Sequence, residues 1–261
     1  MSKARYTSDL SDEQWKLISH LFKPVPKTGR PRKHSYREIL NGIFYVIRTG
    51  CQWRNVASDL PPWSVLYTYY RNWILGGFWI ELHDYLRRKL RFACGRKAKP
   101  SAAIIDSQSV KSTECNEIRG FDAGKKINGS KRHLVVDTLG LVLIVMVTGA
   151  NVQDRDAAQG LFTALFQAYG TIQLVWADSG YAGQLVHWVW QQFRKCLDIV
   201  KPVPGKKGFH VQRKRWIVER TFGWLGRWRR LSKNYERKTD TAEALVYISM
   251  THLMLRRLAE F

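Results

Sequence analysis

Five segments in the first third of the chain place hydrophobic residues three or four positions apart, the spacing of amphipathic helices. Ser11 and Gln14 have the spacing of a capping box at the start of the first segment, and Gly50 ends the second. Short helices, tight turns and basic residues are compatible with a helix-turn-helix, and a plain helical bundle also fits. The predicted helices are 7–22, 36–48, 53–60, one that begins after a cap at Ser64, and 78–92.

The hydrophobic pattern changes after a charged stretch at 95–100, where we place a domain boundary between residues 1–97 and 98–261. Alternating or continuous apolar runs predict strands, and the turn at 137–140 predicts a hairpin. The predicted strands are 102–110, 133–136, 141–148, 172–177 and 197–200, with helices at 154–169, 184–194 and 241–258 and a basic loop at 202–208. This order predicts an α/β (α+β) domain with a mixed sheet after the helical segment.

A further helix, predicted at 216–231, has two dissimilar faces. The apolar face carries Ile217, Thr221, Trp224, Leu225 and Trp228. The opposite face carries Arg215, Glu219, Gly223, Gly226 and Arg230, with Arg220 and Arg227 beside it. Because glycine inside a helix costs about 1 kcal/mol relative to alanine, two glycines on one face suggest close approach of a bulky group. Pairing of Glu219 with its neighbouring arginines is the simpler interpretation.

Composition indicates a polyanionic partner. The 261 residues include 43 Lys and Arg against 21 Asp and Glu, a net charge of +22 that points first to nucleic acid. Binding to a membrane surface is the alternative, but no apolar run approaches the roughly 20 residues of a spanning helix, and no signal peptide is evident. Four widely spaced cysteines form no zinc or disulfide pattern, so we expect a reducing cytoplasm.

The Pro-rich basic stretch at 23–33 contains Arg30, Arg32 and Lys33. Its composition is incompatible with regular structure, and it is typical of an extended arm that lies along phosphates or in a minor groove. A solvated linker is the alternative.

Three carboxylates fall on three different predicted elements. Asp106 lies inside an apolar strand, Asp178 ends another, and Glu219 lies on the helix predicted at 216–231. A buried carboxylate is costly unless it is paired or binds a metal, although either aspartate alone could be a cap or an ion-pair partner. Three carboxylates at one end of a sheet can hold two Mg²⁺ ions about 4 Å apart, a pair that promotes in-line phosphoryl transfer. A basic surrounding surface suits a DNA substrate.

Other polar residues admit two interpretations each. His133 could contact phosphate or assist the site, but an ordinary strand-edge histidine is the simpler interpretation. The loop 119–130 is bracketed by basic residues and could touch DNA or be merely solvated; the basic residues are Lys111, Lys125, Lys126, Lys131 and Arg132. Asp154 and Asp156 suit the start of a helix, and Asp137 suits a turn. Tyr181 and Trp216 could stack on an unpaired base or fill the core.

Four segments in order resemble the bacterial insertion-sequence DDE transposases, and more narrowly the insertion-sequence-five family. They are Ile105-Asp-Ser-Gln-Ser-Val-Lys111, the stretch 129–140, Trp176-Ala-Asp-Ser-Gly-Tyr-Ala-Gly183 and Val218-Glu-Arg-Thr-Phe-Gly-Trp-Leu225. The similarity runs from about residue 7 to residue 258. It implies a ribonuclease H-like catalytic domain with Asp106 on the first strand, Asp178 after the fourth and Glu219 on a later helix.

The implied activity is Mg²⁺-dependent cleavage at transposon ends, followed by transfer of the 3′-hydroxyl into target DNA, with Mn²⁺ as a substitute ion. Related transposases carry a tyrosine, arginine, glutamate and lysine signature around the last acid. This chain keeps Arg215 and Glu219 but has Gln212 and Gly226 at the other two positions, with Arg227 next to the latter. We therefore do not predict a hairpin-forming step.

The expected partners are double-stranded DNA, both terminal inverted repeats and target, and a second copy of the chain in the DNA complex. The resemblance also implies a bacterial cytoplasm and association with the nucleoid. Residues 1–97 would form a DNA-binding domain and 98–261 the catalytic domain. Two other classes stay open: a non-enzymatic DNA-binding relative, and a nuclease or recombinase of similar core that does not transpose. The expected DNA-binding residues are Arg30, Arg32, Lys33, Arg71, Lys111, Lys125, Lys126, Lys131, Arg132, Arg215, Arg220, Arg227 and Arg230.

Overall fold

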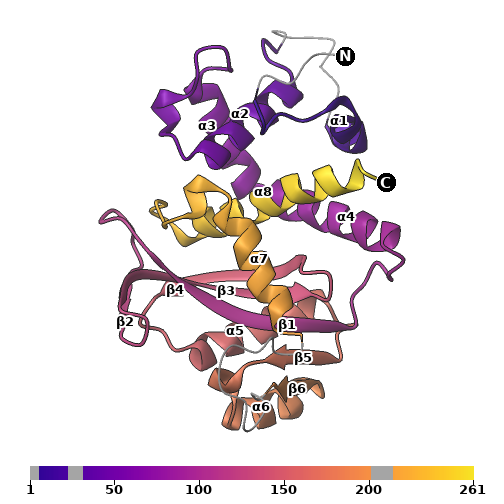
Figure 1. The fold of residues 1–261 in the computed structure, drawn as a ribbon, viewed down its shortest axis with the longest axis vertical. Helices are drawn as coiled ribbons and strands as arrows, with labels where there is room; N and C mark the ends of the chain where they lie inside the picture. The colour runs from indigo at the N-terminus through magenta and orange to yellow at the C-terminus, as the bar shows by residue number, and fades with distance from the viewer. Residues whose placement is uncertain (1–5, 23–31, 201–213) are drawn as a thin grey trace.

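The computed structural model describes residues 6–22, 32–200 and 214–261. The basic arm predicted at 23–33 lies outside the described residues except for Arg32 and Lys33, and the loop predicted at 202–208 lies wholly outside them. Within the described chain, a helical part at the top of Figure 1 precedes a mixed sheet, which confirms the predicted fold class.

The helical part follows from local sequence signals. Both predicted capping-box residues, Ser11 and Gln14, bond reciprocally, and Ser35 forms a second box with Glu38. Gly50 ends its helix with a φ of +73°, a conformation that favours glycine. The elements are α1 (Asp12–Ile18), η1 (Ser19–Leu21), α2 (Tyr36–Thr49), η2 (Trp53–Asn55), α3 (Trp63–Leu75) and α4 (Phe78–Ala93).

Two helix predictions need correction. The helix predicted at 53–60 is a single 3-10 turn, η2, followed by a turn in which Leu60 N donates to Ala57 O. The next helix begins at Trp63, with Pro62 rather than Ser64 at the cap, because Val65 N and Leu66 N both bond to Pro62 O. Proline is favourable at a helix start, since it contributes no N–H that would need a partner.

The sheet has the order β2-β3-β1-β5-β6, with β4 paired to β3. Strands β3 and β4 run antiparallel, β3 and β1 are also antiparallel, and β5 and β6 lie parallel to β1. The predicted loop 119–130 is instead a short hairpin, because β2 pairs with the beginning of β3. The strands are β1 (Ala102–Lys111), β2 (Gly120–Asp122), β3 (Ile127–Asp137), β4 (Val142–Gly149), β5 (Leu174–Ala177) and β6 (Cys196–Ile199).

The predicted hairpin between β3 and β4 turns at Asp137. Its Oδ1 accepts hydrogen bonds from Leu139 N and Leu141 N, and Gly140 takes a φ of +81° in the turn. Asp137 is fully buried, and its Oδ2 accepts from Arg91 Nη1 of α4 at 2.7 Å. The turn residue thus also ties the helical part to the sheet.

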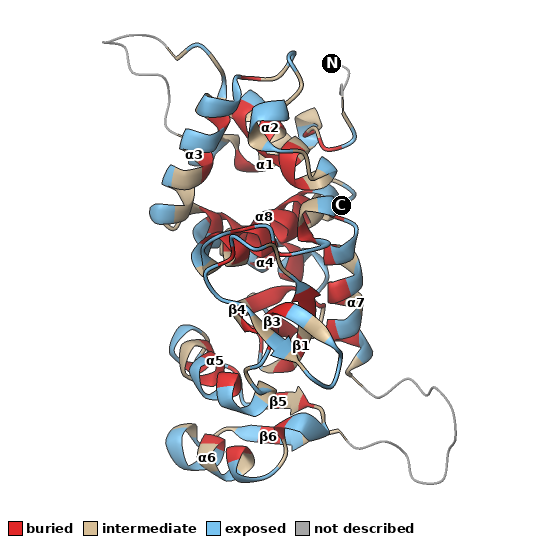
Figure 2. Ribbon diagram, turned by 90° about the vertical axis from the view of Figure 1, so that its left-hand side faces the viewer, coloured by how far each residue is buried: buried red, intermediate tan, exposed pale blue. Residues whose placement is uncertain are grey.

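Helices cover both faces of the sheet, as Figure 2 shows with α5 (Asp154–Ala168) and α6 (Gln184–Phe193) on one side and α7 (Trp216–Gly226) on the other. Because side chains alternate along a strand, successive residues of β1 face opposite layers of helices. Ala103 and Ile105 of β1 pack with α5 and α6, whereas Ile104 packs with α7 and the final helix α8 (Thr239–Leu258). Short turns η3 (Ser179–Tyr181) and η4 (Arg229–Leu231) follow β5 and α7.

One hydrophobic core crosses the boundary placed between residues 97 and 98. Helix α8 packs against α4, and its buried residues join those of the helical part and of the sheet face under α7. Representative members along the chain are Leu10, Ile43, Leu86, Ile104, Leu134, Leu225 and Met254. The helical part and this face of the sheet therefore share their interior.

The four cysteines are all free. Among the described residues, no helix is both long and apolar enough to cross a membrane.

Candidate active site

The register of the sheet brings Asp106 and Asp178 together. Strand β1 is parallel to β5, with Ile104 opposite Trp176. Two residues further along each strand come Asp106 and Asp178, on the same face as Ile104 and Trp176 because side chains alternate with a period of two. Both Ile104 and Trp176 pack into the core under α7. The two aspartates therefore lie at one end of the sheet, on the side that α7 covers.

Helix α7 supplies the third acid. Val218, Phe222 and Leu225 are buried against the sheet and α8, which orients the helix, and Glu219 lies on the outer side with 48% of its side chain exposed. Glu219 thus points away from the hydrophobic interior, toward the end of the sheet where the two aspartates lie.

Arg215, one turn before Glu219, links all three carboxylates. Its Nη2 atom lies 3.4 Å from Asp106 Oδ2, 3.6 Å from Asp178 Oδ2 and 3.7 Å from Glu219 Oε1. Three carboxylates from β1, from the end of β5 and from α7 therefore surround a single cationic nitrogen. The sequence predicted the three acids, expected Arg215 to contact DNA and offered pairing of Glu219 with neighbouring arginines, but it did not indicate that Arg215 lies among all three acids.

Local hydrogen bonds fix two of the acids. Asp106 Oδ1 accepts from Ser107 N at 2.7 Å, and Asp178 Oδ1 accepts from Gly180 N at 2.9 Å. Burial raises the pKa of Asp106 to about 6, against the opposing effects of the Ser107 N–H and the Arg215 charge, while the charge of Asp178 adds to the rise. Asp106 is consequently ionised for the most part at neutral pH.

The donor set is suited to a hard divalent cation. All three groups offer carboxylate oxygens, the ligands that Mg²⁺ prefers, and they already enclose one positive charge. Within the described part of the chain, however, no group of three His, Cys, Asp or Glu side chains stands close enough together to hold a metal ion. The three carboxylates are chemically suited to such an ion, but their spacing is that of groups arranged around the guanidinium of Arg215.

A polar cluster that the sequence did not predict lies next to Asp106, around Ser107. Asp154, expected to cap a helix, is the first residue of α5, and its Oδ1 accepts from Ser107 Oγ at 2.8 Å and pairs with Lys131 Nζ at 3.1 Å. His133 is fully buried beside it, its Nε2 bonded to Thr148 Oγ1 at 2.9 Å. The alternative in which His133 contacts phosphate requires an exposed ring, which the structure does not provide.

Tyr181 also belongs to this interior. Its side chain is fully buried, so it does not present a ring for base stacking, and the pKa of its hydroxyl is raised by burial and by the charges of Asp154, Asp106 and Asp178. Trp216 remains 42% exposed, under the guanidinium of Arg220.

The residues expected to bind DNA fall into three groups. Lys131 and Arg132 are buried and bonded internally: Lys131 Nζ donates to Val152 O, and Arg132 Nη1 donates to Leu231 O. Their side chains lie in the interior because the segment before α5 covers Lys131 on one face of the sheet and η4 covers Arg132 on the other. Lys33, Lys111, Lys125, Lys126 and Arg227 are exposed.

The remaining residues of that set are partly buried. Arg71 donates to Thr241 Oγ1, Arg220 to Leu139 O, and Arg230 pairs with Glu236. Arg32 lies over the ring of Tyr36 at 3.6 Å. Arg30 lies outside the described residues, as does Gln212 of the incomplete signature.

Two models of known protein families together match most of the chain. A family model described as "Transposase DDE domain" matches residues 97–254, and one described as "Putative transposase of IS4/5 family" matches residues 10–83. The first model covers well over half of the chain and includes all three acids, while the second covers most of the helical part.

Two proteins of Burkholderia cepacia align over 125 residues each. The "Insertion element IS402 uncharacterized 16.2 kDa protein" is 33% identical, over 45% of this chain and 78% of the relative. The "Putative transposase for insertion sequence element IS402" is 34% identical, over 43% of this chain, and the alignment spans 56% of that relative's length. With a DDE-domain match that contains the three clustered acids, the chain belongs to the insertion-sequence transposases that carry a DDE domain.

Proposed function

We propose that this chain cleaves DNA at the ends of an insertion sequence and joins the freed 3′-hydroxyl to target DNA. The observation that carries the proposal is the meeting of Asp106, Asp178 and Glu219 around one cationic nitrogen at an open end of the sheet. Each acid comes from a different element, so only the folded chain assembles the group.

Asp106, Asp178 and Glu219 are the residues that would hold Mg²⁺, with Mn²⁺ as a substitute. When bound, the ions activate the attacking water or 3′-hydroxyl and stabilise the leaving oxygen of an in-line phosphoryl transfer. The Ser107 and Gly180 backbone N–H groups orient the two aspartates by fixing one oxygen of each, which leaves the second oxygen directed toward Arg215.

Arg215 holds the acids close together and favours the ionised form of Asp106. Without a cation between them the carboxylates would repel one another, and the pKa of Asp106 would rise further, since Arg215 acts to lower it. The same guanidinium lies where a negatively charged DNA phosphate would have to approach the acids, so we assign Arg215 a role in positioning that phosphate as well as the carboxylates.

The DNA partner would be held by the exposed basic residues around the site and by the helical segment 1–97. Lys111, Lys125 and Lys126 lie on the β1–β3 side, and Arg227 lies at the end of α7. Because two transposon ends must be brought together, we expect two copies of the chain per paired DNA complex. Sedimentation of a paired-end complex that contains one copy would contradict this expectation.

The first testable prediction concerns the acids. Asp106→Asn, Asp178→Asn and Glu219→Gln should each abolish Mg²⁺-dependent nicking of a duplex that contains the element's terminal repeats, because each removes one ionic oxygen ligand. Binding of the same duplex, measured without divalent cation, should persist. Glu81→Gln, which changes an exposed carboxylate on α4, should nick at the wild-type rate.

Three outcomes separate the candidate functions. Full nicking by the Asp178→Asn protein would overturn the mechanism. Nicking without joining of the 3′-hydroxyl to target DNA would leave a nuclease of the same core. Binding without nicking by the wild-type chain would leave a DNA-binding relative that has no catalytic activity.

A further inference from the structure

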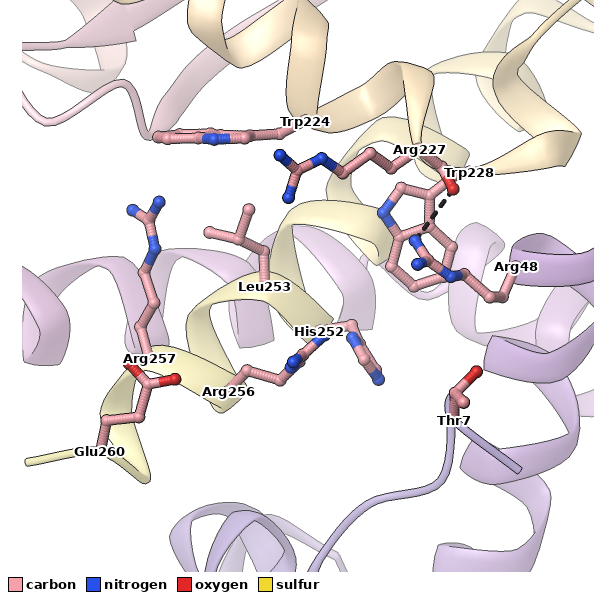
Figure 3. A pocket seen from close by; sticks show the side chains of 10 residues that line it. All are labelled: Thr7, Arg48, Trp224, Arg227, Trp228, His252, Leu253, Arg256, Arg257 and Glu260. Carbon is pink, nitrogen blue, oxygen red and sulfur yellow. Dashed lines mark hydrogen bonds between the residues drawn. The ribbon is translucent and has the colours of Figure 1, made fainter. Parts of the chain in front are cut away.

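An arginine-lined pocket of about 270 Å³ lies where α2, α7 and α8 meet, beside Thr7 near the start of the chain (Figure 3). It does not include the three acids. Four arginines and a single carboxylate, that of Glu260, line it together with two tryptophans. We call this site the arginine pocket. Its arginines are Arg48 from α2, Arg227 from the end of α7, and Arg256 and Arg257 from α8.

Aromatic rings hold two of these guanidiniums. Arg48 lies 5.3 Å from the ring centre of Trp228 and donates to Arg227 O at 2.9 Å, and Arg257 lies 4.2 Å from the ring centre of Trp224. Figure 3 shows Arg227 and Arg257 reaching into the space below the Trp224 ring. The pocket is thus shaped in advance by stacking between arginine and tryptophan.

The protein neutralises the charges in the pocket only in part, because Glu260, which acts on Arg257, is the single carboxylate among the lining residues. Throughout the described ranges, none of the four arginines lies within 4 Å of a carboxylate oxygen in an ion pair, although other arginines of the chain, such as Arg91 and Arg230, are paired in this way. Arg227 and Arg256 are exposed. Several cations gathered in one concavity attract an anion more strongly than the same charges spread over a surface.

The positive charge of the pocket also affects the pKa values of neighbouring groups. The pKa of His252, on the pocket wall, is lowered to about 4 by burial first and then by the charges of Arg256 and Arg48. The pKa of Arg257 is lowered by burial and by nearby Arg220. The pocket therefore retains an unbalanced positive charge that a bound anion would relieve.

Helix α7 connects the pocket to the acids. Glu219 lies near its start and Arg227 follows its end, and eight residues at 1.5 Å each separate them by about 12 Å. Gly223 and Gly226 lie four and seven residues after Glu219, on the same side of the helix, and a side chain added at either would meet nothing within 4 Å. This side of α7 therefore presents an unobstructed surface between Glu219 and the arginine pocket.

We propose that the arginine pocket binds a backbone phosphate of the DNA whose cleaved phosphodiester lies at the three acids. The inference rests on the proposed function for the identity of the DNA. At about 3.4 Å of duplex axis per nucleotide, a 12 Å separation corresponds to roughly three or four base pairs. Arginine suits this task because its planar guanidinium can donate two hydrogen bonds to one phosphate. The contact positions the duplex and reads no base.

The test is the salt dependence of DNA binding by the full chain. Affinity for a fluorescein-labelled duplex of arbitrary sequence is measured by anisotropy over a series of KCl concentrations, without divalent cation. Each lost phosphate contact should reduce the slope of log affinity against log salt by roughly one. Because both side chains serve the same phosphate, Arg227→Gln/Arg256→Gln should lower the slope by about one and Arg256→Gln by part of that amount, with affinity reduced on the order of tenfold in the double variant.

Arg194→Gln is the matched control, because Arg194 is an exposed arginine at the end of α6, on the other side of the sheet. It should leave the slope unchanged. Equal slopes for Arg256→Gln, Arg194→Gln and the wild type would overturn the proposal. Circular dichroism of each variant verifies that the fold is retained, which the exposure of all three side chains favours.

A second arm distinguishes DNA phosphate from a free anion. Inorganic pyrophosphate is titrated calorimetrically into the wild type and into Arg227→Gln/Arg256→Gln. If the variant loses pyrophosphate binding while its DNA salt slope stays at the wild-type value, the pocket serves a small free anion and the proposal is wrong. Since neither arm requires cleavage or a divalent cation, failure of the nicking experiment cannot be mistaken for failure of this one.

Discussion

At the scale of single residues, Arg215 and Asp106 show how burial and charge compete at the site. The pKa of Asp106 is about 6 even though a guanidinium nitrogen lies 3.4 Å from it, because burial outweighs the attraction of the cation. Asp178 and Glu219 are more exposed and share the same guanidinium. One arginine therefore pairs with three acids, and burial raises the pKa of Asp106, the most buried of them.

Buried histidines give a prediction for stability against pH. Burial lowers the pKa of His83 to about 3 and those of His133 and His252 to about 4. Each histidine binds a proton below pH 6.5 in the unfolded chain but not in the folded one, so stability is full above pH 6.5 and is lost as the pH falls toward 4. Asp106 and Glu243, whose pKa values burial raises to about 6, offset part of this loss.

The measurement compares urea unfolding at pH 7.5 and pH 5. By linkage one such histidine contributes a loss of about 2 kcal/mol over this interval. His83→Leu should reduce the difference between the two pH values by about that amount, and exposed His187→Leu should not change it. An unchanged pH dependence in His83→Leu would show that the ring is protonated in the folded protein.

At the scale of elements, the ion pair between Arg91 and Asp137 fastens α4 to the β3–β4 turn. Both side chains are buried, and Arg91 also donates from Nε to Lys97 O. Loss of one partner from a buried pair leaves an uncompensated charge in a medium of low dielectric constant, and this costs more than the pair itself contributes.

Arg91→Met should accordingly lower the free energy of unfolding by about 3 kcal/mol, toward the lower end of the range for such changes because Asp137 keeps two backbone N–H donors. Arg91→Met/Asp137→Asn should lose less than the single variant, since no charge is then left unpaired. Exposed Arg88→Met on the same helix should cost less than about 1 kcal/mol. Urea denaturation measures all three, and equal losses in the single and double variants would exclude an ionic cause.

At the scale of the whole molecule, the shared core makes the two predicted parts depend on each other. Helix α8 follows the sheet in sequence, yet most of its buried side chains pack against α4 and the other helices of residues 1–97 or against β4. A net charge of +22 is carried by this single assembly, so binding to DNA would draw on basic residues from both parts.

We expect one cooperative unfolding transition for the full chain, coincident by tryptophan fluorescence and far-ultraviolet circular dichroism. Residues 98–261 produced alone should show no cooperative transition, because residues such as Ile248, Met250 and Met254 would lose their cover. Two separate transitions, or a stable isolated segment, would show that the boundary between 97 and 98 divides independent folding units.

The sequence by itself determined most of the local structure. Capping signals at Ser11 and Gly50, the hairpin turn at Asp137 and the alternation around Asp106 depend on neighbours a few residues away, and they predicted helices and strands close to those observed. It failed at 53–60, where the helical spacing ends in a turn before Pro61 and Pro62, and at 119–130, where a strand of three residues forms a short hairpin with the beginning of β3. The three acids were identified from residue type and position, and their roles stay predictions.

Only the tertiary structure decided which faces meet. Periodicity tells which side of a helix or strand is apolar, but it does not say what lies against that side, because the partners are far apart in sequence. It could not place Arg215 among three carboxylates, bury Lys131 and Arg132, or gather Arg48, Arg227, Arg256 and Arg257 into one pocket. These arrangements follow from the packing of α7 and α8 across the sheet and the helical part, which brings together charges that the sequence keeps separate.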